Sequence, residues 1–150
     1  RYDTPANQRT DYSTEPDPYN QTTTSDMGML LSDLYYCAEK NGGTLRAVFP
    51  NTITQVECQQ MIEYLKLNEI LAVIAGGLPY GVDIAHKHGW IQEYDGYLHS
   101  MGDVAIVYTD GGDYVLTIFM YHPVQLIFDP ANILFADLSR AVYNYFTLSE

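Results

Sequence analysis

The chain has 150 residues and carries 19 acidic against 7 basic side chains, which gives a formal net charge of −12. Nucleic-acid binding needs many Lys and Arg side chains to displace phosphate counterions, so this composition excludes nucleic acid as a partner. No apolar run is long enough to span a membrane. The length suits one domain with its own core.

The first 21 residues carry Pro5, Pro16 and Pro18 among polar side chains and have no apolar period. A segment of this length without a helix or strand pattern predicts a long loop. The first residue is Arg1 and no signal segment follows it, so we expect that the true N-terminus has been removed or lies upstream.

Two capping boxes mark the starts of two helices. Thr23 and Asp26 precede an apolar helical period that predicts a helix from Thr24 to Lys40, ended by Asn41-Gly42-Gly43. Thr54 and Glu57 begin a second helix that runs to Lys66. The segment 45–50 between them favours a helical turn.

Cys37 and Cys58 fall on these two predicted helices. Two alternatives stay open: one disulfide, or two buried free thiols. The Tyr-rich, Lys-poor composition suits a secreted protein, so we expect an extracellular, periplasmic or cell-surface location.

The second half of the chain reads as a sheet. Residues 69–74 are predicted to be buried on all sides, and Gly76-Gly77-Leu78-Pro79 turns them into a first strand over 81–91. A second strand covers 103–109. The hairpin turn Asp110-Gly111-Gly112-Asp113 leads into a third strand, Tyr114 to His122.

The last segment predicts a helix, with Asp129 as its cap and Pro130 at its first position. An apolar stripe of Leu134, Leu138, Ala141 and Tyr145 is expected to pack on one face of the sheet. The predicted fold class is therefore α+β: helices followed by a three-stranded antiparallel sheet, with a C-terminal helix packed on it.

The strand over 81–91 carries the residues of greatest chemical interest. Lys87 lies on one face, and Gly89 follows two residues later. A fixed ammonium beside a backbone without Cβ can hold an anionic group and offer an N–H to a developing oxyanion. His86 and His88 share a face, so a zinc site with His99 or His122 is an alternative, as is a purely structural role for these side chains.

Three blocks resemble the second half of the class A β-lactamase-like, penicillin-binding serine hydrolases. Residues 22–27 are similar to the start of the helix after that family's omega loop. Residues 77–91 resemble the strand with the Lys-Thr/Ser-Gly triad, and residues 102–119 resemble the next hairpin. The resemblance implies a partial β-lactamase/transpeptidase-like fold in which 1–150 is the C-terminal portion of the domain. Within it, 1–21 is omega-loop-like, 22–80 is the helical part, and 81–150 is the sheet with the C-terminal helix.

The resemblance also implies roles for single residues. Lys87 corresponds to the lysine that supports proton transfer and attracts the substrate carboxylate. The backbone N–H of Trp90 corresponds to part of the oxyanion hole, and His88 and Gly89 correspond to substrate-binding positions. His88 stands where the family has a hydroxyl. No cofactor and no metal are implied.

The chain departs from the family at the nucleophile. The motif Ser-x-x-Lys is absent, because the positions three residues before the lysines hold Cys37, Glu63 and Ile84. A cysteine nucleophile at Cys37 is a remaining alternative. No Ser-x-Asn motif is found. The candidates for a deacylation base are Asp3, Asp11, Glu15 and Asp17.

Two functional hypotheses follow. In the first, the chain is part of a β-lactamase-like serine hydrolase that forms an acyl-enzyme on an amide or ester, such as a β-lactam or a cell-wall-derived compound. The half of this enzyme that carries the nucleophile then lies outside these residues, and the chain alone is expected to be inactive. In the second, the scaffold is a non-catalytic binding or interaction module.

We expect a small-molecule or peptide-like substrate. We also expect the N-terminal half or another chain to pair with the strand Tyr114 to His122, because an unpaired apolar edge invites a partner.

Overall fold

The computed structural model describes residues 22–93 and 95–147. The elements, in chain order, are α1 (Thr24–Lys40), α2 (Gly43–Val48), α3 (Gln55–Lys66), the 3-10 turn η2 (Ala75–Gly77), β1 (Ile84–Gln92), β2 (Leu98–Val107), β3 (Tyr114–Tyr121) and α4 (Phe128–Thr147). This order confirms the predicted α+β class. The omega-loop-like segment 1–21, with its four candidate bases, lies outside the described residues.

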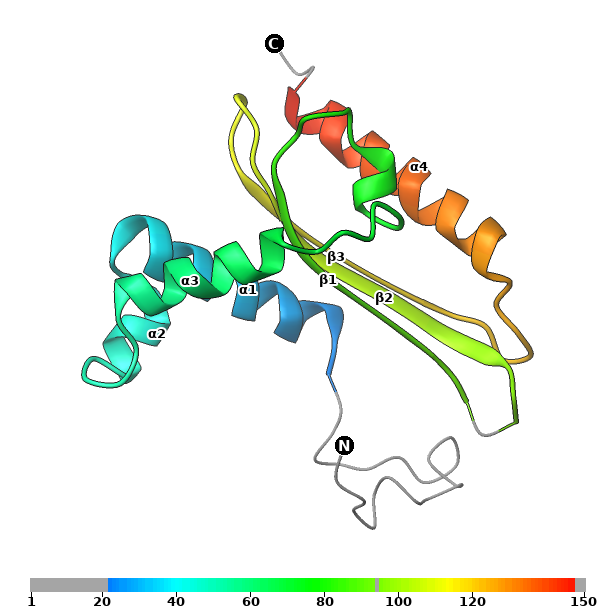
Figure 1. Cartoon of the computed structure of the whole chain (residues 1–150), viewed down its shortest axis with the longest axis horizontal. Coiled ribbons are helices and arrows are strands. Elements are labelled where there is room, and N and C mark those ends of the chain that lie inside the picture. Colours follow the sequence, from blue (N-terminus) through cyan, green and yellow to red (C-terminus); the bar gives the residue numbers. More distant parts are fainter. Residues whose placement is uncertain (1–21, 94, 148–150) are drawn as a thin grey trace.

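The three strands form an antiparallel sheet in the order β1-β2-β3, with helices on both faces. Helices α1 to α3 cover one face, and η2 with α4 covers the other (Figure 1). Side chains of β2 alternate between the two cores: Val104 and Ile106 pack with α1 and α3, whereas Ala105 and Val107 pack with α4. The middle strand is therefore buried on both sides.

Both predicted capping boxes are present. Thr23 Oγ1 accepts the N–H of Asp26 at 3.1 Å, and the Asp26 carboxylate accepts the N–H of Thr23 at 3.0 Å. Thr54 and Glu57 repeat the arrangement at α3. Helix α1 ends at Asn41, which adopts the left-handed conformation with φ of 50° and so turns the chain away.

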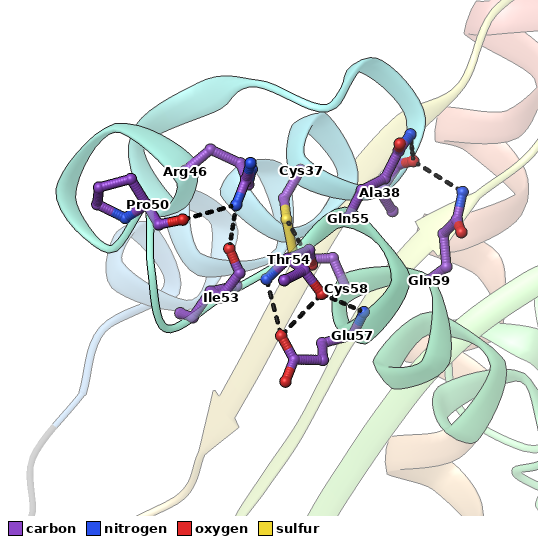
Figure 2. The surroundings of a disulfide bond; sticks show 10 residues. All are labelled: Cys37, Ala38, Arg46, Pro50, Ile53, Thr54, Gln55, Glu57, Cys58 and Gln59. Atoms are coloured by element: carbon purple, nitrogen blue, oxygen red, sulfur yellow. Dashed lines mark hydrogen bonds between the residues drawn. A yellow bond between two sulfur atoms is a disulfide. The ribbon is translucent and has the colours of Figure 1, made fainter.

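Cys37 and Cys58 form a disulfide between α1 and α3, with 5.9 Å between their Cα atoms (Figure 2). Both residues are fully buried. The side-chain amides of Gln55 and Gln59 donate to the carbonyl of Ala38 and so join the same two helices. Of the two alternatives, a disulfide or two free thiols, the structure has the disulfide. Because its sulfur is bonded to Cys58, Cys37 is not available as a nucleophile.

The apolar run over 69–74 is less buried than predicted. Val73 and Ile74 are fully buried, but Ile70 is exposed and Leu71 is 78% exposed. Asn68 Oδ1 accepts the N–H of Ile70, which holds the start of the run in a turn at the surface. Only the end of the run therefore enters the core.

The strands and the last helix also differ in extent from the prediction. Strand β1 begins at Ile84, because Gly81 has a φ of 88° and belongs to the preceding turn. Strand β2 begins at Leu98, five residues earlier than predicted, because the β1–β2 connection is short. Helix α4 begins at Phe128, so Asp129 lies in its first turn.

The predicted buried stripe of α4 is wrong. Leu134, Leu138, Ala141 and Tyr145 are exposed, whereas Ala131, Phe135 and Ser139 are buried. The cause is close packing of η2 against α4: a Cβ on Gly77 would lie 2.7 Å from the Cβ of Ser139, so the helix needs a small side chain at position 139. Ser139 Oγ also donates to the carbonyl of Ile74 at 2.8 Å, which satisfies its buried hydroxyl.

Within residues 22–93 and 95–147, no helix has the combination of length and apolarity that crossing a membrane requires.

The orientation of α4 predicts effects of very different size for truncations at two neighbouring positions. Phe135→Ala leaves a cavity in the core and should lower the free energy of unfolding by about 3–5 kcal/mol. Leu134→Ala removes a side chain that is 59% exposed and should change it by less than about 0.5 kcal/mol. Urea unfolding of both variants checks this. Equal losses would restore the predicted stripe.

The disulfide predicts a second stability effect. It closes a loop with a sequence separation of 21, so Cys37→Ser with Cys58→Ser should lower the free energy of unfolding by about 2–4 kcal/mol. Chemical reduction of the wild type should give a similar loss, and reduction of the double variant should give none. A reactive thiol in the unreduced, urea-unfolded wild type would contradict the bond.

Candidate functional site

The candidate site lies on β1, which is an edge strand of the described sheet. Ala85 packs with the core under α1, while Ile84 and Trp90 pack with the core under α4. Because side chains alternate along a strand, Lys87 and Gly89 face the α1 side, and His88 faces the α4 side. Lys87 and Gly89 therefore share one face of β1, as the alternation along the sequence predicts.

Lys87 is exposed, and its Nζ donates to the backbone carbonyl of His88 at 2.7 Å. The lysine ion pairs in the described part of the chain are those of Lys66 with Glu63 and Asp83. The ammonium of Lys87 therefore lies at the outer edge of β1, and no carboxylate of residues 22–93 or 95–147 forms an ion pair with it.

The backbone N–H of Trp90 also points to the outer edge of β1. The carbonyl of Asp83 accepts from Tyr108 on the β2 side, whereas the carbonyl of His86 accepts from the Asn68 side chain on the opposite side. Backbone groups alternate along an antiparallel strand, so those of His86, His88 and Trp90 share the outer edge. This edge places a cation and a main-chain donor within a few residues of each other.

An open apolar groove of about 790 Å³ runs over the α1 side of the sheet beside Lys87. Gly89 and Gly102 are opposite each other across the β1–β2 ladder and form part of its floor. Met27 at the start of α1 and Phe119 on β3 contribute to its lining. Ligand sites of this kind combine apolar lining with a few polar groups.

His88 is held on two sides. Its Nδ1 lies 3.0 Å from Nδ2 of Asn68, and its ring stacks on Trp90 with 4.4 Å between centroids. Burial lowers the pKa of His88, and the positive charge of Lys87 lowers it further. The imidazole at this position is therefore biased toward its neutral form.

Behind the strand, His86 and Asp103 form a buried pair. His86 Nδ1 lies 3.1 and 3.2 Å from the two carboxylate oxygens of Asp103, and both residues are at most 1% exposed. The carboxylate also accepts the N–H groups of Ile74 and Val104. Nε2 of His86 is buried and has no hydrogen-bond partner among the described residues.

The alternative of a zinc site is not supported. The described residues contain no group of three or more His, Cys, Asp or Glu side chains that could hold a metal. His86 is engaged by Asp103, and His99 is engaged by Asp95. The ring of His122 accepts two backbone N–H groups of the following turn.

Two members of the site were missed by the sequence reasoning. Asp103 begins the predicted second strand, although a carboxylate inside the apolar run of β2 signals a buried polar partner. Asn68 follows the end of α3 in a turn, and nothing in its local sequence distinguishes it from an ordinary turn residue.

His99 links the β1–β2 connection to the end of β3. Its Nε2 lies 2.7 Å from the Asp95 carboxylate, and its Nδ1 lies 3.1 Å from the carbonyl of His122. Both partners are acceptors, so only the doubly protonated ring makes both bonds. These bonds raise the pKa of His99, and the N–H of Tyr97 followed by His99 lowers the pKa of Asp95.

This link predicts a pH dependence of stability. The raised pKa of His99 gives stabilisation that is complete below about pH 6.5 and is lost as the pH rises through the folded-state pKa. The lowered pKa of Asp95 gives stabilisation that is lost below about pH 4. The melting temperature of the wild type should exceed that of His99→Gln by the largest amount between about pH 4 and pH 6.5. The difference between the two melting temperatures should become small at about pH 9. A pH-independent difference would contradict the protonated bridge.

Comparison with known proteins gives the family of this fold. A family model described as the beta-lactamase enzyme family matches residues 3–146. No curated protein sequence matches the chain.

Solved structures agree in fold. A PBP-A mutant in its acyl-enzyme complex with penicillin G is 21% identical, with a TM-score of 0.64 over 88% of this chain and 43% of that chain. The TLA-1 extended-spectrum β-lactamase is 18% identical, with a TM-score of 0.64 over 83% and 41%. A class A β-lactamase of the last common ancestor of Gram-negative bacteria is 19% identical, with a TM-score of 0.60 over 87% and 43%. The chain thus spans about two fifths of the length of these structures, and by the family match it belongs to the β-lactamase enzyme family.

Proposed function

We propose that the chain contributes half of an acyl-transfer site in a β-lactamase-like serine hydrolase. Lys87 supplies the cation that supports proton transfer and attracts a substrate carboxylate. The N–H of Trp90 stabilises the oxyanion, and His88 and Gly89 contact the substrate. The observation that best supports this is the common outer edge of β1, where the Lys87 ammonium and the Trp90 N–H lie and where no strand of the described residues pairs with β1.

The chemical argument is electrostatic. In acyl transfer, negative charge develops on the carbonyl oxygen, and preorganised donors that need not reorient stabilise it most. Here the N–H belongs to a strand held by β2 on its other side. A rigid strand is thus a suitable support for the donor.

The nucleophile is proposed to come from outside these 150 residues, because no lysine follows a serine at the required spacing. The matched structures are more than twice as long as the aligned part, which is consistent with this arrangement. We propose that the missing part, or another chain, also supplies a strand against the free edge of β3. Phe119 and Tyr121 are both exposed on that strand.

The substrate is proposed to be a small amide or ester, such as a β-lactam or a cell-wall-derived compound. The buried disulfide supports an oxidising location, either extracellular, periplasmic or at the cell surface. A non-catalytic binding module is the second candidate, and the imidazole of His88 in place of a hydroxyl is the observation that favours it.

Labelling with a fluorescent penicillin tests the proposal. In the complete natural protein, a serine outside these 150 residues should be acylated, and Lys87→Ala should slow acylation by about 10²- to 10³-fold. Lys66→Ala removes a lysine that pairs with Glu63 and Asp83 and is the matched control, with no expected effect.

Two outcomes would overturn this reading. Nitrocefin hydrolysis by the pure 150-residue chain would place the nucleophile within it. A complete protein that takes no label and contains no Ser-x-x-Lys motif would favour the binding module.

A further inference from the structure

The side chain of Asn68 makes three contacts that fix which way its amide points. Nδ2 lies 3.3 Å from the carbonyl oxygen of His86 and 3.0 Å from Nδ1 of His88. Oδ1 accepts the N–H of Ile70 at 3.2 Å. A reversed amide would set oxygen against the His86 carbonyl and NH₂ against the Ile70 N–H, so each backbone contact independently requires the orientation given.

This orientation determines the proton position on His88. The amide group that meets Nδ1 is a donor, so Nδ1 must be the bare, accepting nitrogen of the ring. A neutral imidazole has one bare nitrogen and one N–H, and therefore the proton lies on Nε2. Nε2 has no hydrogen-bond partner in the described part of the chain and is not among its buried unpartnered atoms.

The charged groups around the ring favour the neutral form. Burial and the ammonium of Lys87 oppose a second proton, as does His86 from the same face. The carboxylate of Asp103 raises the pKa of His88, but this carboxylate also accepts hydrogen bonds from His86 and from two backbone N–H groups. Lys66, at the end of α3, is paired with Glu63 and Asp83.

We infer that Asn68 is a positioning residue that holds His88 as the neutral tautomer with its proton on Nε2. The middle position of Lys87-His88-Gly89 then carries one uncharged N–H donor, at Nε2 of His88. The significance of this assignment rests on the proposed function. If His88 contacts the substrate, an N–H donor at that position suits an anionic group of the ligand, such as a carboxylate. Without Asn68, the ring could offer a bare nitrogen there, which would repel that group.

The consequence differs from that of a hydroxyl at the same place. A hydroxyl rotates and can donate or accept, whereas the ring of His88 is held by Trp90 on its face and by Asn68 at Nδ1. The position therefore selects ligands that accept a hydrogen bond and disfavours ligands that need to donate one.

NMR spectra of the ring nitrogens of the isotope-labelled 150-residue chain test the inference directly. We expect a protonated-type signal at Nε2 and a bare-nitrogen signal at Nδ1 of His88 at neutral pH. A proton on Nδ1, or an equal mixture of the two tautomers, would overturn it. This measurement needs no variant and no substrate, so its outcome is independent of the labelling result with penicillin.

Asn68→Asp replaces the donor that faces Nδ1 of His88 with an acceptor and keeps an acceptor for the N–H of Ile70. A carboxylate beside Nδ1 should move the proton to Nδ1 and raise the proton affinity of His88 by about tenfold or more. Asn68→Ala should give a mixture of tautomers. Asn51→Asp adds the same charge in the exposed loop before α3 and is the matched control, with no expected change. If Asn68→Asp leaves the proton on Nε2, the inference is wrong.

Discussion

The burial of one carboxylate constrains most of this structure. Asp103 lies on β2, the strand that is covered on both faces, and its side chain is completely inaccessible. A carboxyl group in such a place is tolerated only if hydrogen-bond donors surround it. His86 from β1 and the backbone N–H groups of Ile74 and Val104 are those donors.

The geometry of these donors joins three parts of the chain. The bond to His86 fixes one face of β1, and the alternation of the strand then sends Lys87 to the opposite face. The bond to Ile74 holds the segment that precedes η2, on which α4 packs. The edge strand and the last helix are thus both positioned through a residue that touches neither the groove nor its proposed ligand.

Much of the fold was predictable because its signals are local. Thr23 with Asp26, and Thr54 with Glu57, act over one helical turn and require nothing from the rest of the chain. The alternation around Lys87 is likewise a property of the strand itself. The predicted stripe of α4 was wrong because two neighbouring faces of the helix carry apolar residues, and the contact with Gly77 decides which of them is buried. That contact joins positions about sixty residues apart and leaves no mark in the local sequence; the roles of Asp103 and Asn68 are hidden for the same reason.

The two glycines that meet across the β1–β2 ladder are under different physical constraints. A Cβ on Gly102 would lie 2.8 Å from the ring of Phe119, so packing requires glycine there. A Cβ on Gly89 would meet no atom of the described residues within 4 Å, and its backbone does not adopt a left-handed conformation. Selection for folding alone would keep Gly102 and would allow Gly89 to be replaced by residues with better strand propensity. A glycine at position 89 is therefore a residue that foldability does not explain.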